Sequence, residues 1–241
     1  MTARAILFDL GDTLFRLDPL PADLDSRAAN RLAAMGCGSA DRLRPTCAAA
    51  LAGIRDKVAN AFARGGLEEH DIASLARLHF RDAGMSLAAG AATAVAAVLG
   101  EADVERFVPP AGLAARVRAF QEVGYRLAAV SNTTTSPELL DGYLERIGLR
   151  DLFDAAVYSS AIGVRKPHPL VYRRALAALD VEPQHAVFVG DRVREDVVGP
   201  QAVGIRAVLT HEFRREDPGA AAPLAVIPAL DQLGAVLERL P

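Results

Sequence analysis

Short apolar runs that end abruptly in polar residues recur along the chain. The first run, residues 4–8, is followed by Asp-Leu-Gly-Asp-Thr, and the later runs end in hydroxyl, amide or acidic residues. Continuous apolar runs of this length are typical of strands that are buried on both faces of a parallel sheet. The sequence therefore predicts five strands, at residues 4–8, 127–130, 155–158, 186–189 and 205–209.

Stretches with a helical pattern separate these predicted strands along the second half of the chain. Strands that alternate with helices are typical of an open parallel sheet with helices on both of its faces. We therefore predict an α/β fold with a Rossmann-like parallel sheet, whose helices lie near residues 113–123, 137–147, 169–179 and 193–203.

The segment between the first and second predicted strands contains no convincing strand pattern. A connection of this length inside a compact domain needs structure of its own. We predict an all-helical domain at residues 16–107, inserted into a core formed by residues 1–15 and 108–241, with Pro19, Pro21 and Pro109–Pro110 at the junctions. Its expected helices lie near residues 22–35, 41–64, 68–83 and 87–99.

The composition limits the classes of function. With 51% hydrophobic and 24% charged residues, the 241-residue chain can bury a sizeable core. The formal net charge of −3 provides no basic field for nucleic acid. The apolar stretch 87–99 is shorter than the roughly 20 residues that span a bilayer, so we expect no membrane partner. Cys37 and Cys47 form no Cys-x-x-Cys pair, which favours a reducing compartment and a cytoplasmic location.

Polar residues that could take part in catalysis or binding lie at the ends of the predicted strands. Ligands of open parallel sheets bind outside the carboxyl ends of the strands, where Asp9, Ser131 and Asp191 fall and where Lys166 follows nearby. Each residue taken alone has an ordinary explanation as a turn former, a turn hydroxyl, a helix cap or a surface charge. Asp191 and Asp196 together suit a hard cation, and they suit the positive end of the next helix equally well.

The order of four short motifs changes this interpretation. Asp-x-Gly-Asp-Thr at Asp9, Ser-Asn at Ser131, Lys-Pro at Lys166 and Gly-Asp-x-x-x-x-Asp from Gly190 follow one another at strand ends. Together they resemble the motifs of the haloacid dehalogenase-like hydrolase superfamily, and the helical insertion resembles its α-helical cap. The resemblance implies a Mg²⁺-dependent hydrolase of a small phosphorylated metabolite that acts through an aspartyl-phosphate intermediate.

The resemblance also implies a role for each motif residue. A carboxylate nucleophile would attack phosphorus, a Mg²⁺ ion with oxygen ligands would offset the repulsion between the two anions, and donors would hold the phosphate oxygens. The nucleophile would be Asp9. The metal ligands or their supports would be Asp9, the Gly11 carbonyl, Asp191 and Asp196. The phosphate-binding groups would be Ser131, Asn132 and Lys166.

One position departs from the pattern of the superfamily's phosphatases. They usually read Asp-x-Asp-x-Thr, and their second Asp protonates the leaving oxygen, whereas this chain has Gly11 there and an acid one residue later, at Asp12. Adjacent side chains of an extended segment point in different directions, so we expect Asp12 to point away from the leaving group. Asp12 is the candidate replacement acid, and without one the rate falls roughly a hundredfold or more.

Members of the superfamily that lack the second Asp provide two alternatives. The 2-haloacid dehalogenases need no metal, and their fourth motif differs from the Gly-Asp-x-x-x-x-Asp found here. The phosphonate-cleaving enzymes use a cap lysine, and Lys57, the sole lysine of the insertion, has the sequence context of a surface residue. A third alternative, from a different class, is a catalytically weak member kept for binding or regulation.

Overall fold

A computed structural model describes residues 4–240 and divides the chain into two compact units. One unit, called the α/β unit here, comprises the described residues up to Asp18, Phe107–Thr133 and the residues from Asp141 onward. The other, the helical unit, comprises Pro19–Arg106 and Thr134–Leu140.

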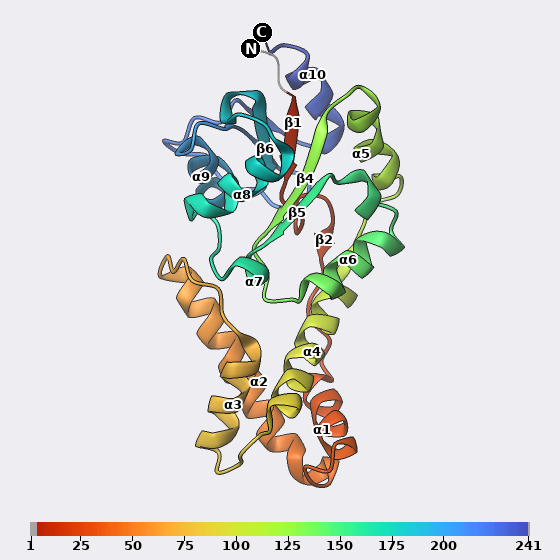
Figure 1. Ribbon diagram of the computed structural model, residues 1–241, viewed down its shortest axis with the longest axis vertical. Helices are drawn as coiled ribbons and strands as arrows, with labels where there is room; N and C mark the ends of the chain where they lie inside the picture. Colours follow the sequence, from red (N-terminus) through yellow and green to blue (C-terminus); the bar gives the residue numbers. More distant parts are fainter. Residues whose placement is uncertain (1–3, 241) are drawn as a thin grey trace. The chain divides into compact units, whose positions relative to one another are not determined.

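The α/β unit is built on a parallel sheet of six strands (Figure 1). All five predicted strands are present, and a sixth short strand, absent from the sequence-based prediction, extends the sheet at one edge. This arrangement confirms the predicted Rossmann-like α/β fold. The strand order is β5 (Ala155–Tyr158), β4 (Arg126–Ser131), β1 (Ala5–Phe8), β6 (Ala186–Gly190), β7 (Arg206–Thr210) and β8 (Ala225–Ile227).

The register of the three central strands brings their carboxyl ends to one level. Phe8 of β1 is paired with Ala129 of β4 on one side and with Val189 of β6 on the other. The ladder continues one residue further, because the Asp9 amide donates to the Val189 carbonyl over 2.9 Å. Asp9 is therefore fixed by the sheet itself at the end of the central strand.

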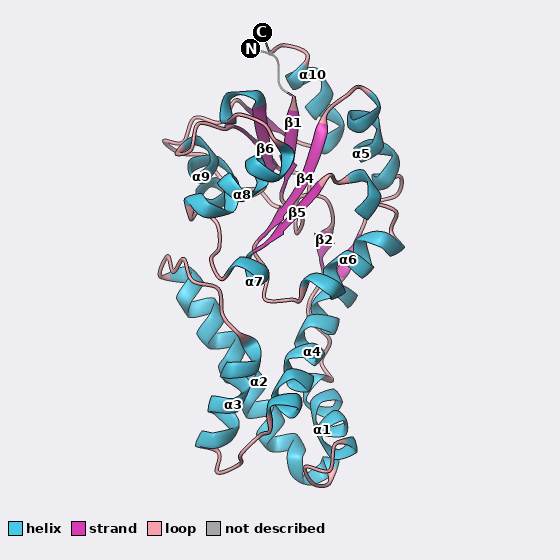
Figure 2. Cartoon of the chain, in the orientation of Figure 1, coloured by secondary structure: helices cyan, strands magenta, loops and turns pink. Residues whose placement is uncertain are grey.

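Helices cover both faces of the sheet, as Figures 1 and 2 show for α8 and α9 on one side and α5 on the other. Alternate residues of β1 point to opposite faces. Leu7 joins the core cluster under α8, whereas the Phe8 ring lies 6.1 Å from Phe120 of α5. The helices of this part of the chain are α5 (Leu113–Glu122), α6 (Pro137–Arg146), α7 (Ser159–Ile162), α8 (Pro169–Leu179), α9 (Gly199–Gln201) and α10 (Leu233–Leu237), with short 3₁₀ turns at Arg150–Leu152, Pro183–His185 and Leu230–Gln232.

The helix expected at residues 193–203 has a different form in the structure. It consists of a π-helix, η3 (Val193–Val198), followed by the one-turn helix α9. Pro200 has no amide hydrogen and suits the first turn of a helix, so a new helix begins there in place of a continuous one. The wide π turn holds Asp196 beside the end of β6.

The helical unit contains four helices that bury a core of their own. They are α1 (Leu24–Ala34), α2 (Ala40–Ala63), α3 (Ile72–Asp82) and α4 (Ala89–Glu105). Fully buried alanines and leucines line their contacts, as at Ala28, Leu32 and Ala92, and α4 is bound to α1 by the pairs Arg27–Glu105 and Arg31–Glu101. Within residues 4–240, no helix is both long and apolar enough to cross a membrane.

The two chain segments that lead into and out of the helical unit lie side by side in the α/β unit. They form an antiparallel ribbon of β2 (Arg16–Leu17) and β3 (Phe107–Val108), in which Leu17 pairs with Phe107. Phe107 also stacks on Phe15, with ring centroids 4.6 Å apart. The ribbon keeps both junctions at one place, a feature that the short polar and proline-rich junction sequences do not indicate.

Candidate active site

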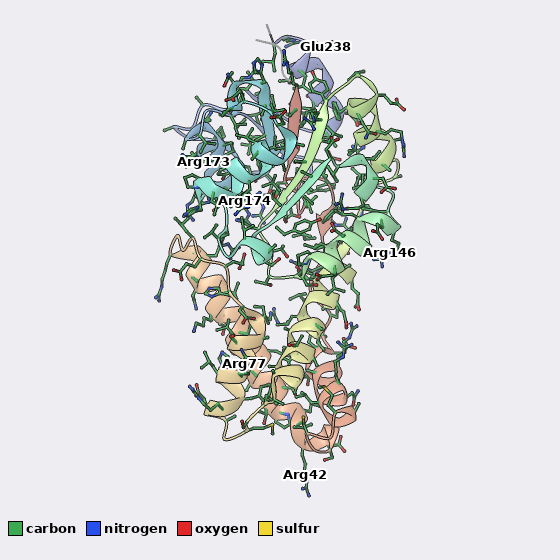
Figure 3. All side chains as sticks on the ribbon, in the orientation of Figure 1. Arg42, Arg77, Arg146, Arg173, Arg174 and Glu238 are labelled. Atoms are coloured by element: carbon green, nitrogen blue, oxygen red, sulfur yellow. The ribbon has the colours of Figure 1, made fainter. Side chains whose placement is uncertain are left out.

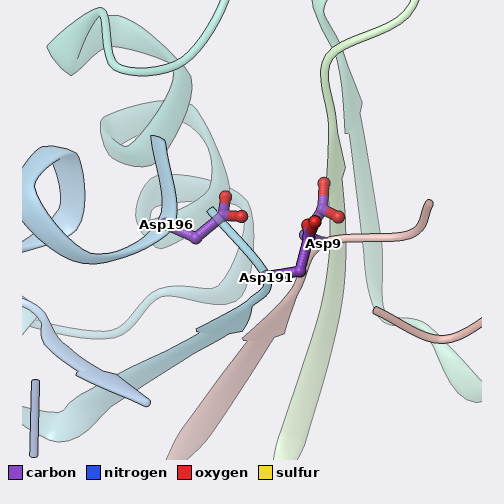
Figure 4. Close-up of side chains that lie close together, drawn as sticks. All are labelled: Asp9, Asp191 and Asp196. Atoms are coloured by element: carbon purple, nitrogen blue, oxygen red, sulfur yellow. The ribbon is translucent and has the colours of Figure 1, made fainter. Parts of the chain in front are cut away.

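Three buried carboxylates meet beyond the ends of β1 and β6 (Figure 4). Asp9 follows β1, Asp191 follows β6, and Asp196 lies in η3. Each offers one oxygen, and these oxygens lie within 4.8 Å of one another. Because Asp191 and Asp196 are only 1% exposed, their charges are almost entirely removed from water. Carboxylate oxygens in this number and proximity are ligands that suit a hard divalent cation.

A single buried ammonium group joins two of these carboxylates. Lys166 is 2% exposed, and its Nζ donates to Asp9 Oδ1 and to Asp196 Oδ1, each over 2.7 Å. The Nζ also lies 5.0 Å from the centre of the Phe188 ring. A buried charge is tolerated only when it is paired and hydrogen-bonded, so Lys166 and the carboxylates depend on one another.

The side chain of Asn132 holds the backbone of Lys166 in place. Its Nδ2 donates to the Lys166 carbonyl over 3.0 Å, and its Oδ1 accepts from the Lys166 amide over 2.7 Å. Ser159 in turn holds Thr133, the residue after Asn132, because the Ser159 hydroxyl accepts from the Thr133 amide over 2.7 Å. The Ser-Asn motif therefore positions the lysine of the next motif, a function of the Asn132 side chain that the sequence reasoning missed.

Ser131 is the last residue of β4 and is 7% exposed. Because β4 lies beside β1 with Ala129 opposite Phe8, Ser131 is at the same end of the sheet as Asp9. The strand-end residues Asp9, Ser131 and Asp191 thus lie with Lys166 at the carboxyl ends of the strands of one sheet, as their positions after predicted strands indicate.

Thr13 contributes a hydroxyl group that the sequence analysis did not single out. Its Oγ1 lies 3.0 Å from Asp9 Oδ2 and 3.4 Å from Asp191 Oδ1, and its side chain is fully buried. A hydroxyl has one hydrogen to donate, and the shorter contact favours Asp9 as the acceptor. The signal was available, since Thr13 closes the Asp-x-Gly-Asp-Thr motif.

Asp196 reaches the cluster because Gly190 has no side chain. A Cβ at Gly190 would lie 2.3 Å from Asp196 Cγ, far inside van der Waals contact. The Arg192 amide donates to Asp196 Oδ2 over 3.0 Å, while Lys166 occupies Oδ1. Both oxygens of Asp196 thus have protein partners, which suits a group that orients Lys166.

Burial and mutual repulsion shift the pKa values of this cluster. Burial, followed by the charges of Asp9 and Asp196, raises the pKa of Asp191 to about 8. Burial also raises the pKa of Asp196, to about 6, although the Lys166 charge opposes the rise. Burial lowers the pKa of Lys166, but the charges of Asp196 and Asp9 outweigh it and the net shift is upward. Burial and the neighbouring carboxylates thus oppose the ionisation of Asp191 and Asp196, and positive charge nearby favours it.

Two contacts hold the carboxylate of Asp12, which is not one of the three clustered carboxylates. Its Oδ1 accepts from the Leu17 amide over 3.1 Å, and its Oδ2 accepts from Arg214 Nη2 over 3.2 Å. Its φ of 57° places it in the left-handed region, which changes the direction of the chain directly after Gly11. The preceding Gly11 lies outside that region, and a Cβ there would meet Leu17 Cδ1 at 2.9 Å.

Two histidines of the α/β unit make local contacts, and the lysine of the insertion is exposed. The ring of His168 accepts from the Leu170 amide over 3.1 Å and caps α8. His211 contacts the Glu216 carbonyl within its own loop, at 3.1 Å. Lys57 is exposed on α2, as its sequence context predicts. Charged residues such as Arg173 and Arg174 of α8 also extend outward from the α/β unit (Figure 3).

Comparison with known proteins identifies the class to which this site belongs. The family model of haloacid dehalogenase-like hydrolases matches residues 3–204. The chain therefore belongs to the haloacid dehalogenase-like hydrolase family, in agreement with the resemblance carried by its four motifs.

Curated relatives match parts of the chain. Segments are 36% identical over 88 residues to a glyceraldehyde 3-phosphate phosphatase of Pyrococcus abyssi, with 36% of each chain covered. They are 38% identical over 104 residues to a phosphoserine phosphatase of Thermus thermophilus, covering 43% of this chain and 41% of the relative. The matches thus span well under two thirds of the length of these relatives.

Two solved structures align with nearly the whole chain. A 2-haloacid dehalogenase from Pseudomonas syringae has a TM-score of 0.71 at 22% identity, with 99% of each chain covered. A HAD phosphatase from Thermococcus onnurineus has a TM-score of 0.64 at 25% identity, with 97% of each chain covered. At 22% identity, the first likeness is evidence for the fold alone.

The raised pKa of Asp191 predicts that this carboxylate destabilises the metal-free protein at high pH. The pKa rises from the ordinary 3.8 to about 8 on folding, so the unfolded chain releases the proton first and stability falls as pH rises between these values. In a chelating buffer at pH 8, we expect Asp191→Asn to raise the melting temperature by roughly 5 °C. Differential scanning calorimetry should show a smaller gain at pH 5. Asp217→Asn, in an exposed loop, is the control, and a lower melting temperature for Asp191→Asn at pH 8 would contradict the prediction.

The close approach of Asp196 to Gly190 predicts a large effect of one methyl group. Gly190→Ala forces Asp196 away from Lys166, and we expect a loss of about 1–3 kcal/mol or more in the free energy of unfolding. The control is Gly142→Ala in α6, where a Cβ meets no atom within 4 Å and a gain of up to about 1 kcal/mol is expected. Urea denaturation measures both, and equal stabilities would show that Asp196 is not held as described.

Proposed function

We propose that this protein is a Mg²⁺-dependent phosphohydrolase in which Asp9 forms a covalent aspartyl-phosphate. The observation that carries the proposal is the pairing of three buried carboxylates, Asp9, Asp191 and Asp196, with one buried ammonium group, Lys166. This arrangement has an excess of negative charge, and one of its carboxylates is the first polar group after the central strand.

The chemistry of the donor set fits a divalent cation. Asp191 Oδ2 is buried and receives no directed hydrogen bond from any residue in the range 4–240, although Arg214 Nε lies 2.7 Å away, so a cation that takes the place of the arginine would find a lone pair there. Asp9, the Gly11 carbonyl and Asp191 would hold the cation, and Asp196 would support the site from behind through Lys166. When bound, a divalent cation supplies the positive charge that offsets the repulsion between a carboxylate and a phosphate.

Asp9 is suited to the role of nucleophile by its contacts. In the first step, a carboxylate oxygen of Asp9 forms a bond to phosphorus while the bond between phosphorus and the leaving oxygen breaks. In the second step, water attacks the aspartyl-phosphate, which releases inorganic phosphate and restores the carboxylate. Lys166 and Thr13 donate to different oxygens of Asp9, so the carboxylate is oriented before the substrate arrives.

Ser131, the backbone amide of Asn132 and Lys166 are proposed to bind the phosphate oxygens. Donors that are fixed before the reaction stabilise the charge that develops in the transition state. The two hydrogen bonds between Asn132 and Lys166 make the lysine part of a rigid loop, which supports this assignment.

The substrate that we propose is a small phosphorylated metabolite. Phosphatases are named among the relatives, including those for glyceraldehyde 3-phosphate and phosphoserine. We propose that the helical unit acts as the cap that selects among such substrates. Gly11 is the residue that favours the alternative of 2-haloacid dehalogenation, whereas the acidic pair Asp191 and Asp196 favours phosphorus chemistry.

Replacing the nucleophile provides the direct test of the proposed reaction. We expect Asp9→Asn to lower Mg²⁺-dependent hydrolysis of p-nitrophenyl phosphate by roughly a thousandfold or more, because an amide is a poor nucleophile. Asp82→Asn, at an exposed carboxylate of the helical unit, should retain wild-type activity. Circular dichroism checks that both variants are folded. Chloride release from 2-chloropropionate by the wild type, with no phosphate release, would instead support the dehalogenase alternative.

The contacts of Asp12 predict that the leaving group controls the rate. Because Leu17 and Arg214 hold the Asp12 carboxylate, we expect turnover to rise steeply as the leaving group becomes more acidic, with aryl phosphates far ahead of alkyl phosphates. The measurement is kcat/KM against leaving-group pKa, and Asp12→Asn should leave the slope unchanged.

A double variant extends this prediction. Gly11→Asp with Leu17→Ala restores an acid and removes the Leu17 Cδ1 atom that a Cβ at Gly11 would meet, and it should accelerate alkyl phosphate hydrolysis by about a hundredfold. Leu17→Ala alone is the control. A shallow slope in the wild type, combined with a steep one in Asp12→Asn, would make Asp12 the general acid.

A further inference from the structure

An arginine outside the four motifs reaches the candidate metal site. Arg214 lies in the loop between β7 and β8, and its Nε is 2.7 Å from Asp191 Oδ2. Its Nη2 is 3.2 Å from Asp12 Oδ2, so one guanidinium spans both carboxylates. The arginine is 38% exposed and Asp191 only 2%, measured on the side chains, so a solvated loop brings a positive charge to a buried anion.

The contact between Arg214 and Asp191 is an ion pair without a directed hydrogen bond. Over the described part of the chain, Asp191 Oδ2 and Arg214 Nε are each buried without a hydrogen-bond partner, although they are only 2.7 Å apart. A well-aligned arginine–carboxylate pair is bidentate and directional, and such a pair resists replacement. Charge attraction thus holds Arg214 at Asp191 Oδ2, while its hydrogen bond to Asp12 holds the other side of the guanidinium.

We propose that Arg214 is an internal counter-cation of the metal site, which a divalent cation displaces from Asp191 when it binds. This inference rests on the proposed function, since it requires that Asp191 is a metal ligand. Arg214 neutralises part of the buried negative charge while the site has no metal, and it competes with the metal for Asp191 Oδ2. The competition lowers the affinity of the site for Mg²⁺.

Displacement of Arg214 also has a consequence for the loop that bears it. Asp12 is held by the Leu17 amide as well as by Arg214, so it stays in place when the arginine leaves. Contacts with the rest of the α/β unit hold both ends of the loop of residues 211–224: Glu212 contacts Arg116 and the Leu230 amide, and the backbones of Ala222 and Leu224 contact Gln201 and Ala207. Between these ends, Arg214 attaches residues 213–220 to the site through its ion pairs with Asp12 and Asp191. Metal binding should therefore release residues 213–220, and this segment reports whether the metal site is filled.

Isothermal titration of the metal-free protein with Mg²⁺ tests the proposal without relying on catalysis. The variant is Arg214→Gln, and its matched control is Arg215→Gln, which removes the same charge from the next, exposed residue of the same loop. We expect Arg214→Gln to bind Mg²⁺ about tenfold more tightly than the wild type, which corresponds to about 1.4 kcal/mol. Arg215→Gln should change the affinity less than twofold. Unchanged or weaker binding by Arg214→Gln, with Mg²⁺ binding intact in the wild type, would overturn the counter-cation role alone.

Two further measurements separate this proposal from the proposed function. Asp191→Asn should lose Mg²⁺ binding, and if neither the wild type nor Arg214→Gln binds Mg²⁺, the metal site itself is wrong and both proposals fail. Hydrogen exchange should show faster exchange of the 213–220 amides on addition of Mg²⁺ to the wild type. In Arg214→Gln, the same amides should exchange fast with and without Mg²⁺. A loop that Mg²⁺ leaves unchanged in the wild type would contradict displacement.

Discussion

The burial of three carboxylates around one ammonium group is the constraint on which the rest of the α/β unit depends. Burial raises the pKa values of Asp191 and Asp196, and the charge of the neighbouring Asp9 adds to the rise. Most of the features near the site limit the energetic cost of this burial. Lys166 forms ion pairs with two of the carboxylates, Gly190 has no side chain and so leaves space for Asp196, and Asn132 fixes the loop that carries the lysine.

The parallel sheet makes this concentration of charge possible. Because β1, β4 and β6 are in register, groups that are far apart in the sequence emerge at one level, and the ladder bond from the Asp9 amide extends that order by one residue. The core beneath is apolar and fully buried, as at Phe8 and Val189, so the polar ends have no alternative partners in the interior. The rigid apolar core thus keeps the polar side chains of the site close together, which a flexible core would not do.

The parts of the structure that the sequence predicts are those with local causes. Apolar runs and the motifs that follow them predict the strands, the α/β fold and the edge at which Asp9, Ser131, Lys166 and Asp191 lie. The remainder depends on contacts between residues distant in sequence. The Arg214 contacts with Asp12 and Asp191 have no periodic or motif signal, since they arise from loop geometry. The Ser-Asn and Lys-Pro motifs mark Asn132 and Lys166, but they do not indicate that the two residues are hydrogen-bonded to each other. The short edge strand β8 and the π-helix η3 depend likewise on their neighbours in the fold.

Gly11 and Arg214 both limit the repulsion between carboxylates near Asp9 and Asp191. A hydrolase with an acid at residue 11 would place a further carboxylate near Asp9 and Asp191, and repulsion there would raise the cost of the metal-free state. In this chain the acid is at Asp12, where the Leu17 amide and Arg214 bind it, so its charge is neutralised locally. The same arginine also reaches Asp191, so one guanidinium serves both carboxylates while the site has no metal. Once a divalent cation takes over the charge of Asp191, Arg214 is no longer held there, and the event that fills the site also frees the loop that carries the arginine.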